Sequence, residues 1–320
     1  MYTILDYIYM KFNILITAFP FVNEYKKLKK LFKNDDFNIK IVKTSQSLKE
    51  KDLLGIINNI DGVLCGDDEF TERVLKKANR LKVLSKWGTG IDSIDLKTCK
   101  KLKIKVYNTP GAFTESVATQ ALALILNFNR KIIQNHNNIK NGVWNKLSGS
   151  TLINKNIGII GLGNIGLRIA ELLIPFKCNT FGNDIKKISF KKLKRLNLKM
   201  KSKNFIYSKS DIIIIATDLN YSTKYLINSK IFKFIKNKPL IVNIARGPII
   251  NEKALISLLK NNIISGACLD VFENEPIKIN SKILKFKNTI LTSHNAFNTI
   301  DEVNKVHVNT YKNLILGLKK

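Results

Sequence analysis

Three glycines spaced as G-x-G-x-x-G constrain the fold of this chain more than any other feature. The motif, residues 161–166, directly follows the apolar run 155–160 and opens a segment with helical periodicity, 164–176. Its first glycine permits a tight strand-to-helix turn, its second lets backbone N–H groups approach a pyrophosphate, and its third allows close packing of helix on strand. The motif predicts a dinucleotide site at the positive end of a helix. The expected cofactor-binding residues are Gly161, Gly163, Asn164, Ile165 and Gly166.

An acidic residue follows the next expected strand. Asp184 lies roughly 20 residues past the motif, where a carboxylate accepts hydrogen bonds from both hydroxyls of an adenosine ribose. A carboxylate there repels a 2′-phosphate, so Asp184 favours NAD over NADP. Lys186 and Lys187 offer a 2′-phosphate two positive charges, so NADP remains the alternative. The structural alternatives are a plain tight turn for the glycines and a solvated loop acid for Asp184.

Short β-branched runs alternate with helical patterns along two stretches of the chain. The first stretch begins at Phe12 and ends near Asn108, and the second begins at Lys155. Such alternation predicts parallel sheets covered by helices, and the second stretch predicts a doubly wound nucleotide-binding domain. The expected strands are 12–18, 38–42, 62–66, 82–87 and 104–108, then 156–161, 179–184, 211–217, 239–245, 265–271 and 288–293.

Two longer helices are expected outside this alternation. Segment 114–132 has Ala and Leu at helical spacing, with Thr114 as a helix cap, and predicts a buried helix crossing between the domains. Segment 299–320 is amphipathic and is expected to pack back on the first domain. Its apolar side is formed by Val303, Val306, Tyr311, Leu314 and Leu318.

The charge of the chain is strongly positive. There are 54 Lys and Arg against 24 Asp and Glu, a formal net charge of +30, which by itself is typical of proteins that bind nucleic acid or anionic membranes. The lysines are scattered through every element, however, and the densest basic stretch, 186–203, lacks the interleaved aromatic residues of single-strand binders. The pattern therefore argues against a specific nucleic-acid partner.

The cysteines and the N-terminal segment limit the compartment. Four cysteines stand far apart without a CxxC pair, so reduced core thiols are expected and no metal site. The first 12 residues have no basic n-region or cleavage site, and no apolar run reaches the length of a membrane span. A cytoplasmic protein is expected, with Met10 as an alternative start to Met1.

Six segments carry a resemblance over nearly the whole chain. They read SKWGTGIDSID, VYNTPGAFTESVA, GIIGLGNIG, VNIARGPIINEKAL, GACLDVFENEP and TSHNAF. Their order and separations resemble the D-isomer-specific 2-hydroxyacid dehydrogenases, in particular the phosphoglycerate-dehydrogenase-like branch. This implies a two-domain α/β fold in which a Rossmann NAD-binding domain, residues 111–294, is inserted into a flavodoxin-like substrate-binding domain, residues 1–110 and 295–320. It also implies an oxidoreductase that transfers a hydride between NAD and C2 of a small D-2-hydroxy or 2-keto acid, with its active site between the domains.

By this resemblance an Arg, a His and a Glu carry the chemistry. Arg246 follows an apolar strand, and its planar fork suits the carboxylate and carbonyl oxygens of a 2-keto acid. His294 would give a proton to the keto oxygen and take it back in the oxidative direction. Glu275 would hydrogen-bond the far ring nitrogen of His294 and favour the imidazolium. A satisfied structural histidine is the alternative for His294.

The resemblance implies further contacts with cofactor and substrate. Asp270 would hold the nicotinamide carboxamide, with a turn acid as the structural alternative. Other residues would line the nicotinamide pocket, namely Thr217, Ile244 and Ala245. Three residues would offer backbone N–H groups to the substrate carboxylate, with a simple turn as the alternative. These are Gly88, Thr89 and Gly90.

The substrate is less well specified. Lys86 matches one of the basic residues that face the phosphate in relatives using 3-phosphoglycerate, but a second basic position is replaced in VLCGDDEF by Cys65, Asp67 and Asp68. The sequence therefore argues against phosphoglycerate and leaves an ordinary keto acid, hydroxypyruvate or a phosphorylated hydroxy acid as candidates. Phe113 replaces a polar residue of many relatives, either in the substrate pocket or under the 114–132 helix.

The assembly and a rival function also follow from the resemblance. A homodimer is expected, with the helix 114–132 as a candidate interface element. Some proteins of this fold sense NAD and dock partners without turnover, so a catalytically weak NAD-sensing protein is the alternative to an active dehydrogenase. The intact set of Arg246, Glu275 and His294 favours the enzyme.

Overall fold

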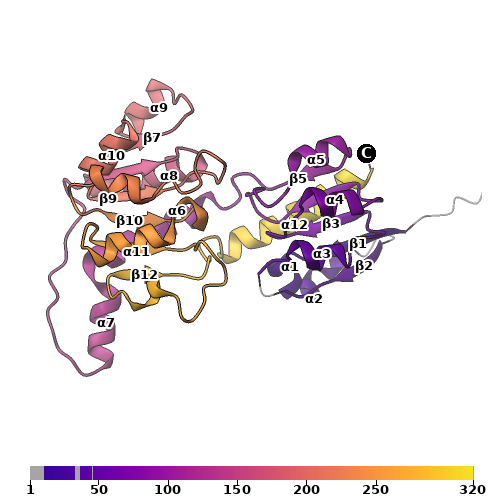
Figure 1. Cartoon of the computed structure of the whole chain (residues 1–320), viewed down its shortest axis with the longest axis horizontal. Coiled ribbons are helices and arrows are strands. Elements are labelled where there is room, and N and C mark those ends of the chain that lie inside the picture. Colours follow the sequence, from indigo (N-terminus) through magenta and orange to yellow (C-terminus); the bar gives the residue numbers. More distant parts are fainter. Residues whose placement is uncertain (1–10, 33–36, 45, 320) are drawn as a thin grey trace, which may run out of the picture. The chain divides into compact units, whose positions relative to one another are not determined.

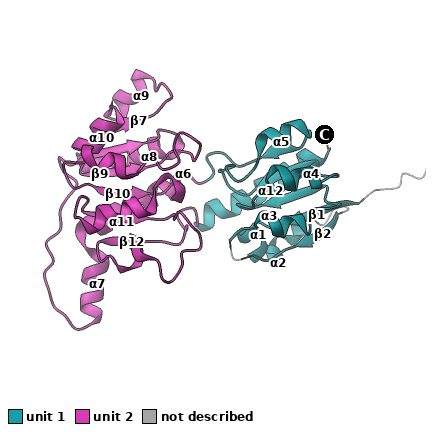
Figure 2. Cartoon of the chain, in the orientation of Figure 1, with its two compact units in different colours: residues 1–112, 299–320 teal, residues 113–298 magenta. Residues whose placement is uncertain are grey.

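The structure is a computed structural model that describes residues 11–32, 37–44 and 46–319. The two candidate start residues, Met1 and Met10, lie outside these residues. The chain forms two compact units (Figure 2). Unit 1 comprises residues 1–112 and 299–320, and unit 2 is the continuous stretch 113–298 that interrupts it.

Unit 1 is built on a five-stranded parallel sheet. Its strand order, β2-β1-β3-β4-β5, is that of flavodoxin-like folds. The strands are β1 (Phe12–Ile16), β2 (Phe37–Ile41), β3 (Gly62–Cys65), β4 (Val83–Lys86) and β5 (Lys105–Tyr107). The helices are α1 (Phe19–Asn23), α2 (Tyr25–Leu28), η1 (Lys29–Phe32), α3 (Glu50–Leu54), α4 (Glu72–Lys77), α5 (Leu96–Lys101) and α12 (Ile300–Lys319).

Unit 2 is built on a seven-stranded parallel sheet. The order β12-β11-β10-β9-β6-β7-β8 places the first strand of the unit, β6, inside the sheet between β9 and β7, as in a doubly wound Rossmann fold. The strands are β6 (Asn156–Ile160), β7 (Asn179–Asn183), β8 (Leu198–Met200), β9 (Ile212–Ile215), β10 (Leu240–Asn243), β11 (Gly266–Leu269) and β12 (Thr289–Leu291). The predicted two-domain α/β class is confirmed.

The helices of unit 2 cover both faces of its sheet (Figure 1). The α-helices are α6 (Thr114–Arg130), α7 (Ile132–Lys140), α8 (Asn164–Leu173), α9 (Phe190–Arg195), α10 (Lys203–Lys209) and α11 (Glu252–Lys260). The short 3-10 helices are η2 (Ile174–Phe176), η3 (Ser229–Phe234), η4 (Gly247–Ile249) and η5 (Lys282–Lys285). Helices α6 and α8 pack against each other, and α6 contacts β10 and β11.

Two predicted helices are divided in the structure. The segment 164–176 is an α-helix only to Leu173, because Pro175 cannot continue the α-helical hydrogen bonds, and residues Ile174–Phe176 form the 3-10 turn η2 instead. The segment 114–132 ends as α6 at Arg130, where Lys131 takes a left-handed conformation with φ 54°, and α7 starts at Ile132. These local backbone breaks set the ends of the two predicted helices. The short strand β8 lies where the sequence patterns predicted no strand.

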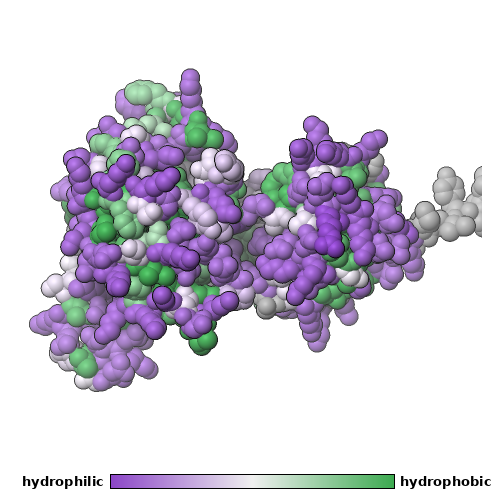
Figure 3. Space-filling view, in the orientation of Figure 1, coloured by the Kyte–Doolittle hydropathy of each residue, from purple (hydrophilic) through white to green (hydrophobic). Residues whose placement is uncertain are grey.

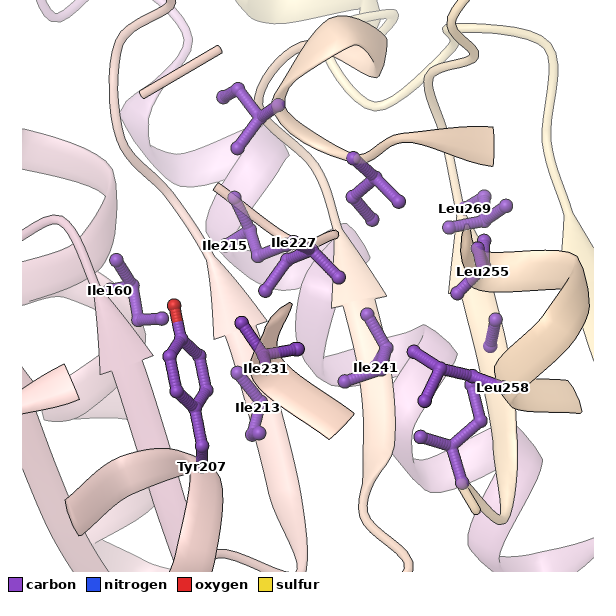
Figure 4. Close-up of a cluster of buried hydrophobic side chains, with 14 of the residues drawn as sticks. Ile160, Tyr207, Ile213, Ile215, Ile227, Ile231, Ile241, Leu255, Leu258 and Leu269 are labelled. Carbon is purple, nitrogen blue, oxygen red and sulfur yellow. The ribbon is translucent and has the colours of Figure 1, made fainter. Parts of the chain in front are cut away.

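The core of unit 2 explains why its strands read as unbroken apolar runs. Strands β9, β10 and β11 are buried at every position, as expected for a parallel sheet with helices on both faces. Figure 4 shows Ile213 and Ile241 of the sheet with Tyr207 of α10 and Leu258 of α11, all belonging to one buried cluster. This packing fixes the positions of the strand ends that carry the candidate site.

The C-terminal helix α12 packs on the sheet of unit 1. It contacts β3, β4 and β5, and buries Val303, Val306, Leu314 and Leu318, as its amphipathic pattern predicts. A Cβ at Gly317 would overlap the side chain of Val83, so this glycine allows the close approach of helix to strand. The first and last parts of the chain therefore share one hydrophobic core.

The surface seen in Figure 3 is largely hydrophilic, with hydrophobic atoms in separate small groups. Within the described residues, none of the helices has the length and apolar character needed to cross a membrane.

Candidate active site

The glycine motif forms the turn between β6 and α8. Gly161 has φ 96°, a conformation that side-chain-bearing residues rarely adopt, so this turn requires glycine. Gly163 is the N-cap of α8, no side chain caps the helix, and a Cβ at Gly163 would meet no atom within 4 Å. The first amides of a three-turn helix thus adjoin open space, and the positive end of the helix favours an anion there.

Asp184 lies directly after β7 and against this turn. Its Oδ2 accepts a hydrogen bond from the backbone N–H of Leu162 at 2.6 Å, and its Oδ1 accepts one from the backbone N–H of Lys186 at 2.7 Å. These bonds fix a negative charge beside the glycine motif. Lys186 and Lys187 are exposed. The open amide-lined turn and the neighbouring carboxylate fit a dinucleotide whose pyrophosphate binds the turn and whose ribose hydroxyls meet an acceptor.

The structure brings His294 and Glu275 together. The Nδ1 of His294 lies 2.8 Å from Oε2 of Glu275, and the side chains are 19% and 21% exposed. The other carboxylate oxygen, Oε1, accepts a hydrogen bond from the backbone N–H of Phe272 at 2.9 Å. The contact leaves Nε2 as the ring nitrogen on the far side from the carboxylate, and a carboxylate at Nδ1 stabilises the protonated ring.

The loop that carries His294 is organised by Asp270. This buried residue follows β11, and its carboxylate accepts hydrogen bonds from the hydroxyl of Thr292 and from the backbone N–H groups of Asn295 and Ala296. The backbone N–H of His294 donates to the carbonyl oxygen of Asp270 at 2.7 Å. His294 has φ 52°, a strained conformation for a residue with a Cβ, and these bonds hold it there.

Arg246 lies just past β10, on a turn held by a side chain that the sequence analysis did not single out. Asn243 is fully buried; its Oδ1 accepts from the backbone N–H of Ala245 at 3.1 Å, and its Nδ2 donates to the carbonyl oxygen of Arg246 at 3.0 Å. The guanidinium donates through Nη1 to the carbonyl oxygen of Ala245 at 2.9 Å. An Asn at the end of an apolar strand was the only sequence signal for this role.

The Arg246 turn and the Glu275 loop are packed directly together. A Cβ at Gly247 would overlap the carbonyl oxygen of Phe272, so only glycine allows this approach. Glu273, also missed from sequence, fixes the same loop because its carboxylate accepts hydrogen bonds from the hydroxyl of Tyr225 at 2.7 Å and from the backbone N–H of Glu252 at 2.8 Å. The positions of the guanidinium and of the Glu275 carboxylate are therefore coupled through backbone contact.

The predicted residues of unit 2 all follow the carboxyl ends of neighbouring strands. In sheet order from β12 to β7 these residues are His294, Asp270, the 244–246 turn, Thr217, the glycine motif and Asp184. Ligands of doubly wound sheets bind at this edge. The structure thus places the cofactor and catalytic candidates of this unit along one sheet edge.

Unit 1 carries the remaining candidates at the end of β4 and directly after it. Gly88 has φ 106°, and its carbonyl oxygen accepts from the backbone N–H of Thr109 at 3.0 Å, while the carbonyl oxygen of Thr89 accepts from the side chain of Asn108 at 2.6 Å. Lys86 is buried, and its Nζ forms an ion pair with Asp67 at 3.1 Å. The loop is therefore a fixed turn, and the nearby lysine charge is balanced within the protein.

Metal and thiol chemistry have no support in the described part of the chain. No three His, Cys, Asp or Glu side chains there are placed to hold a metal ion. All four cysteines are free and buried, and burial raises the pKa of Cys99 to about 11 and that of Cys268 to about 12. These two thiols stay protonated at neutral pH and are poor nucleophiles.

Comparison with known proteins agrees with this geometry. Residues 122–296 match the family model described as D-isomer specific 2-hydroxyacid dehydrogenase, NAD binding domain. A glyoxylate reductase of Thermofilum pendens is 35% identical over 84% of this chain and 81% of its own length. A hydroxypyruvate reductase of Thermotoga maritima is 33% identical over 83% of this chain and 87% of its own.

A solved structure shows the same likeness in three dimensions. The D-lactate dehydrogenase of Aquifex aeolicus, crystallised with NAD and lactic acid, has a TM-score of 0.85 and 26% identity, covering 96% of both chains. With the family model matched over more than half of the sequence and the relatives over most of it, this chain belongs to the D-isomer specific 2-hydroxyacid dehydrogenase family and is an oxidoreductase with an NAD-binding domain.

Proposed function

We propose that this chain reduces a small 2-keto acid to the D-2-hydroxy acid at the expense of NADH, with His294 as the acid and base of the reaction. The observation that carries the proposal is the 2.8 Å contact of His294 with Glu275, on the same sheet edge as the glycine motif. Bound NADH supplies the hydride. The protein supplies orientation, charge and a proton.

Each catalytic side chain has one task in this proposal. Nε2 of His294 gives its proton to the keto oxygen and recovers it when the reaction runs in the oxidative direction. Glu275 holds the imidazole through Nδ1 and stabilises its charged form. Arg246 binds the carboxylate and carbonyl oxygens of the substrate, which orients C2 and stabilises negative charge on the oxygen.

The remaining residues of unit 2 form the proposed NAD site. Gly161 to Gly166 would bind the pyrophosphate and Asp184 the adenosine ribose, which favours NAD over NADP. Thr217 and the backbone of Ile244 and Ala245 would line the nicotinamide site. Asp270 would accept a hydrogen bond from the carboxamide in addition to those that hold the His294 loop, since its Oδ2 accepts a single bond among those described.

Unit 1 is proposed to select the substrate. The turn formed by Gly88, Thr89 and Gly90 would offer backbone N–H groups to the substrate carboxylate. Lys86, two residues before this turn, belongs to the same proposed set. Glyoxylate and hydroxypyruvate are the preferred candidates, because the glyoxylate reductase and the hydroxypyruvate reductase described above are 35% and 33% identical to this chain. Four buried, free cysteines support a reducing, cytoplasmic setting.

A homodimer is proposed, with α7 and the segment after it as the contact. The predicted interface helix α6 buries its apolar residues within unit 2, whereas α7 buries none. Exposed apolar side chains gather on α7 and just beyond, with Trp144 84% exposed. The other exposed apolar side chains of this region are Ile132, Ile133, Ile139 and Val143.

Light scattering after size-exclusion chromatography tests the dimer. Wild-type protein should have twice the 36.4 kDa mass of the chain, and the Trp144→Glu variant should have the mass of one chain. A monomeric wild-type protein would refute the dimer.

The function is tested by NADH oxidation against glyoxylate, hydroxypyruvate, 2-ketoglutarate and 3-phosphohydroxypyruvate. Turnover of glyoxylate or hydroxypyruvate, with chiral analysis showing a D-hydroxy acid for a chiral product, supports the proposal. NADH binding without oxidation by any substrate would contradict it and favour the NAD-sensing alternative. NADPH in place of NADH, as the matched cofactor control, should support less activity at equal concentration.

A further inference from the structure

Lys86 occupies an unusual position for a lysine. It is the last residue of β4, its side chain is 4% exposed, and lysines are rarely buried unless they are paired. Its Nζ lies 3.1 Å from Oδ1 of Asp67 and donates a hydrogen bond to the carbonyl oxygen of Trp87 at 2.9 Å. Asp67 follows β3, the strand paired with β4, so two neighbouring strand ends hold the ammonium group.

A second carboxyl group lies at the same sheet edge. Asp68 is buried and accepts hydrogen bonds from the hydroxyl of Thr17 at 2.6 Å and from the backbone N–H groups of Leu48 and Gly66 at 2.8 and 3.0 Å. None of these partners is a cation, and burial raises the pKa of this carboxyl. The positive charge of Lys86 therefore faces Asp67 directly and has a further acidic group close by.

We infer that Asp67 is a specificity-determining residue, which engages Lys86 and excludes substrates that carry a second anionic group beyond the 2-keto acid. The inference rests on the proposed function. Substrate is expected at the carboxyl edge of the unit 1 sheet, where a phosphate needs a cation that is not already neutralised. Asp67 is 40% exposed, so an approaching anion meets its carboxylate, whereas an uncharged tail meets no such repulsion.

The substitution Asp67→Asn separates charge from shape. Asparagine keeps a carbonyl oxygen for Lys86 Nζ but removes the negative charge. The measured quantity is the kcat/KM for 3-phosphohydroxypyruvate divided by that for hydroxypyruvate. We expect this ratio to rise at least tenfold over wild type, mainly through a lower KM for the phosphorylated substrate. Adding Lys86→Met should remove the gain, and Asp301→Asn, an exposed acid on α12, should leave the ratio unchanged.

A binding measurement keeps this test independent of turnover. Calorimetric titration of NAD-loaded protein with 3-phosphohydroxypyruvate should show at least tenfold tighter binding to Asp67→Asn than to wild type. Equal affinity in a variant that melts like wild type would overturn the inference, as would an unchanged kinetic ratio. Wild type that oxidises NADH with neither glyoxylate nor hydroxypyruvate would overturn the proposed function, and the titration would still decide the role of Asp67.

Discussion

The imidazole Nδ1 of His294 and the carboxylate Oε2 of Glu275 lie 2.8 Å apart, although 19 residues separate them in the chain. The two side chains are supplied by loops after adjacent strands, β11 and β12, and the Asp270 carboxylate fixes the histidine loop through hydrogen bonds from its backbone N–H groups. This arrangement aligns one proton-carrying group with one fixed charge.

Replacing Glu275 by Gln should separate the charge of the carboxylate from its shape. The amide can still contact the imidazole but no longer stabilises its protonated form. We expect kcat/KM for keto-acid reduction to fall about 10- to 100-fold. The pH at which this rate declines should move to lower pH, because protonated His294 is then lost earlier. Glu72→Gln, an exposed acid on α4, is the matched control, and an unshifted pH profile in Glu275→Gln would contradict the assigned role.

Replacing Arg246 by Lys keeps a positive charge but removes the planar fork. A lysine cannot bind the carboxylate and carbonyl oxygens of the substrate together. Steady-state kinetics should show a higher KM and a lower kcat, with kcat/KM reduced about 100- to 1000-fold. Arg195→Lys, at the exposed end of α9, should behave like wild type. Equal kinetics in Arg246→Lys would show that charge alone suffices.

Replacing Asp184 by Ala should weaken the preference for NAD. The carboxylate that accepts the ribose hydroxyls and repels a 2′-phosphate is removed, while Lys186 and Lys187 remain beside it. The KM for NADH should rise about tenfold, as for the loss of a hydrogen bond to a charged group. The KM for NADPH should stay constant or fall. If both cofactors lose affinity equally, Asp184 serves only to hold the glycine turn.

Buried His307 should make the stability of unit 1 depend on pH. Its Nδ1 accepts a hydrogen bond from Nε1 of Trp87 at 3.0 Å, and its Nε2 has no hydrogen-bond partner among the described residues. Burial lowers its pKa from 6.5 to about 4, so the folded state holds the neutral ring. The unfolded chain binds the proton first as pH falls, so this stabilisation is complete above pH 6.5 and is lost progressively towards pH 4.

Urea unfolding followed by the fluorescence of Trp87 measures this effect, in a Trp144→Phe background that removes the other tryptophan. The free energy of unfolding should be about 2 kcal/mol lower at pH 5 than at pH 7.5 on account of His307. His307→Gln should lose this part of the pH dependence, while His136→Gln, on the exposed face of α7, should keep it. The same pH dependence in all three proteins would show that other groups are responsible.

Local patterns were enough to predict the fold class and the strands whose ends carry the candidate site. The glycine motif at 161–166 and the alternation of β-branched runs with helices reflect backbone requirements that neighbouring residues express directly. Interactions across the fold could not be predicted in the same way. The hydrogen bonds of Asp270 to the 292–296 loop and the ion pair of Lys86 with Asp67 join segments that only the folded sheet brings together. The single signal at Asn243, a polar residue ending an apolar strand, was local but ambiguous.

The central claim is that His294 moves the proton in keto-acid reduction, and the most direct test is the NADH oxidation rate of His294→Ala with and without added imidazole. The account predicts a loss of at least about a hundredfold in kcat, unchanged NADH affinity by fluorescence titration, and partial recovery of the rate when imidazole is added. His136→Ala should retain the wild-type rate. A His294→Ala variant that binds NADH and turns over within a few-fold of wild type would contradict the account.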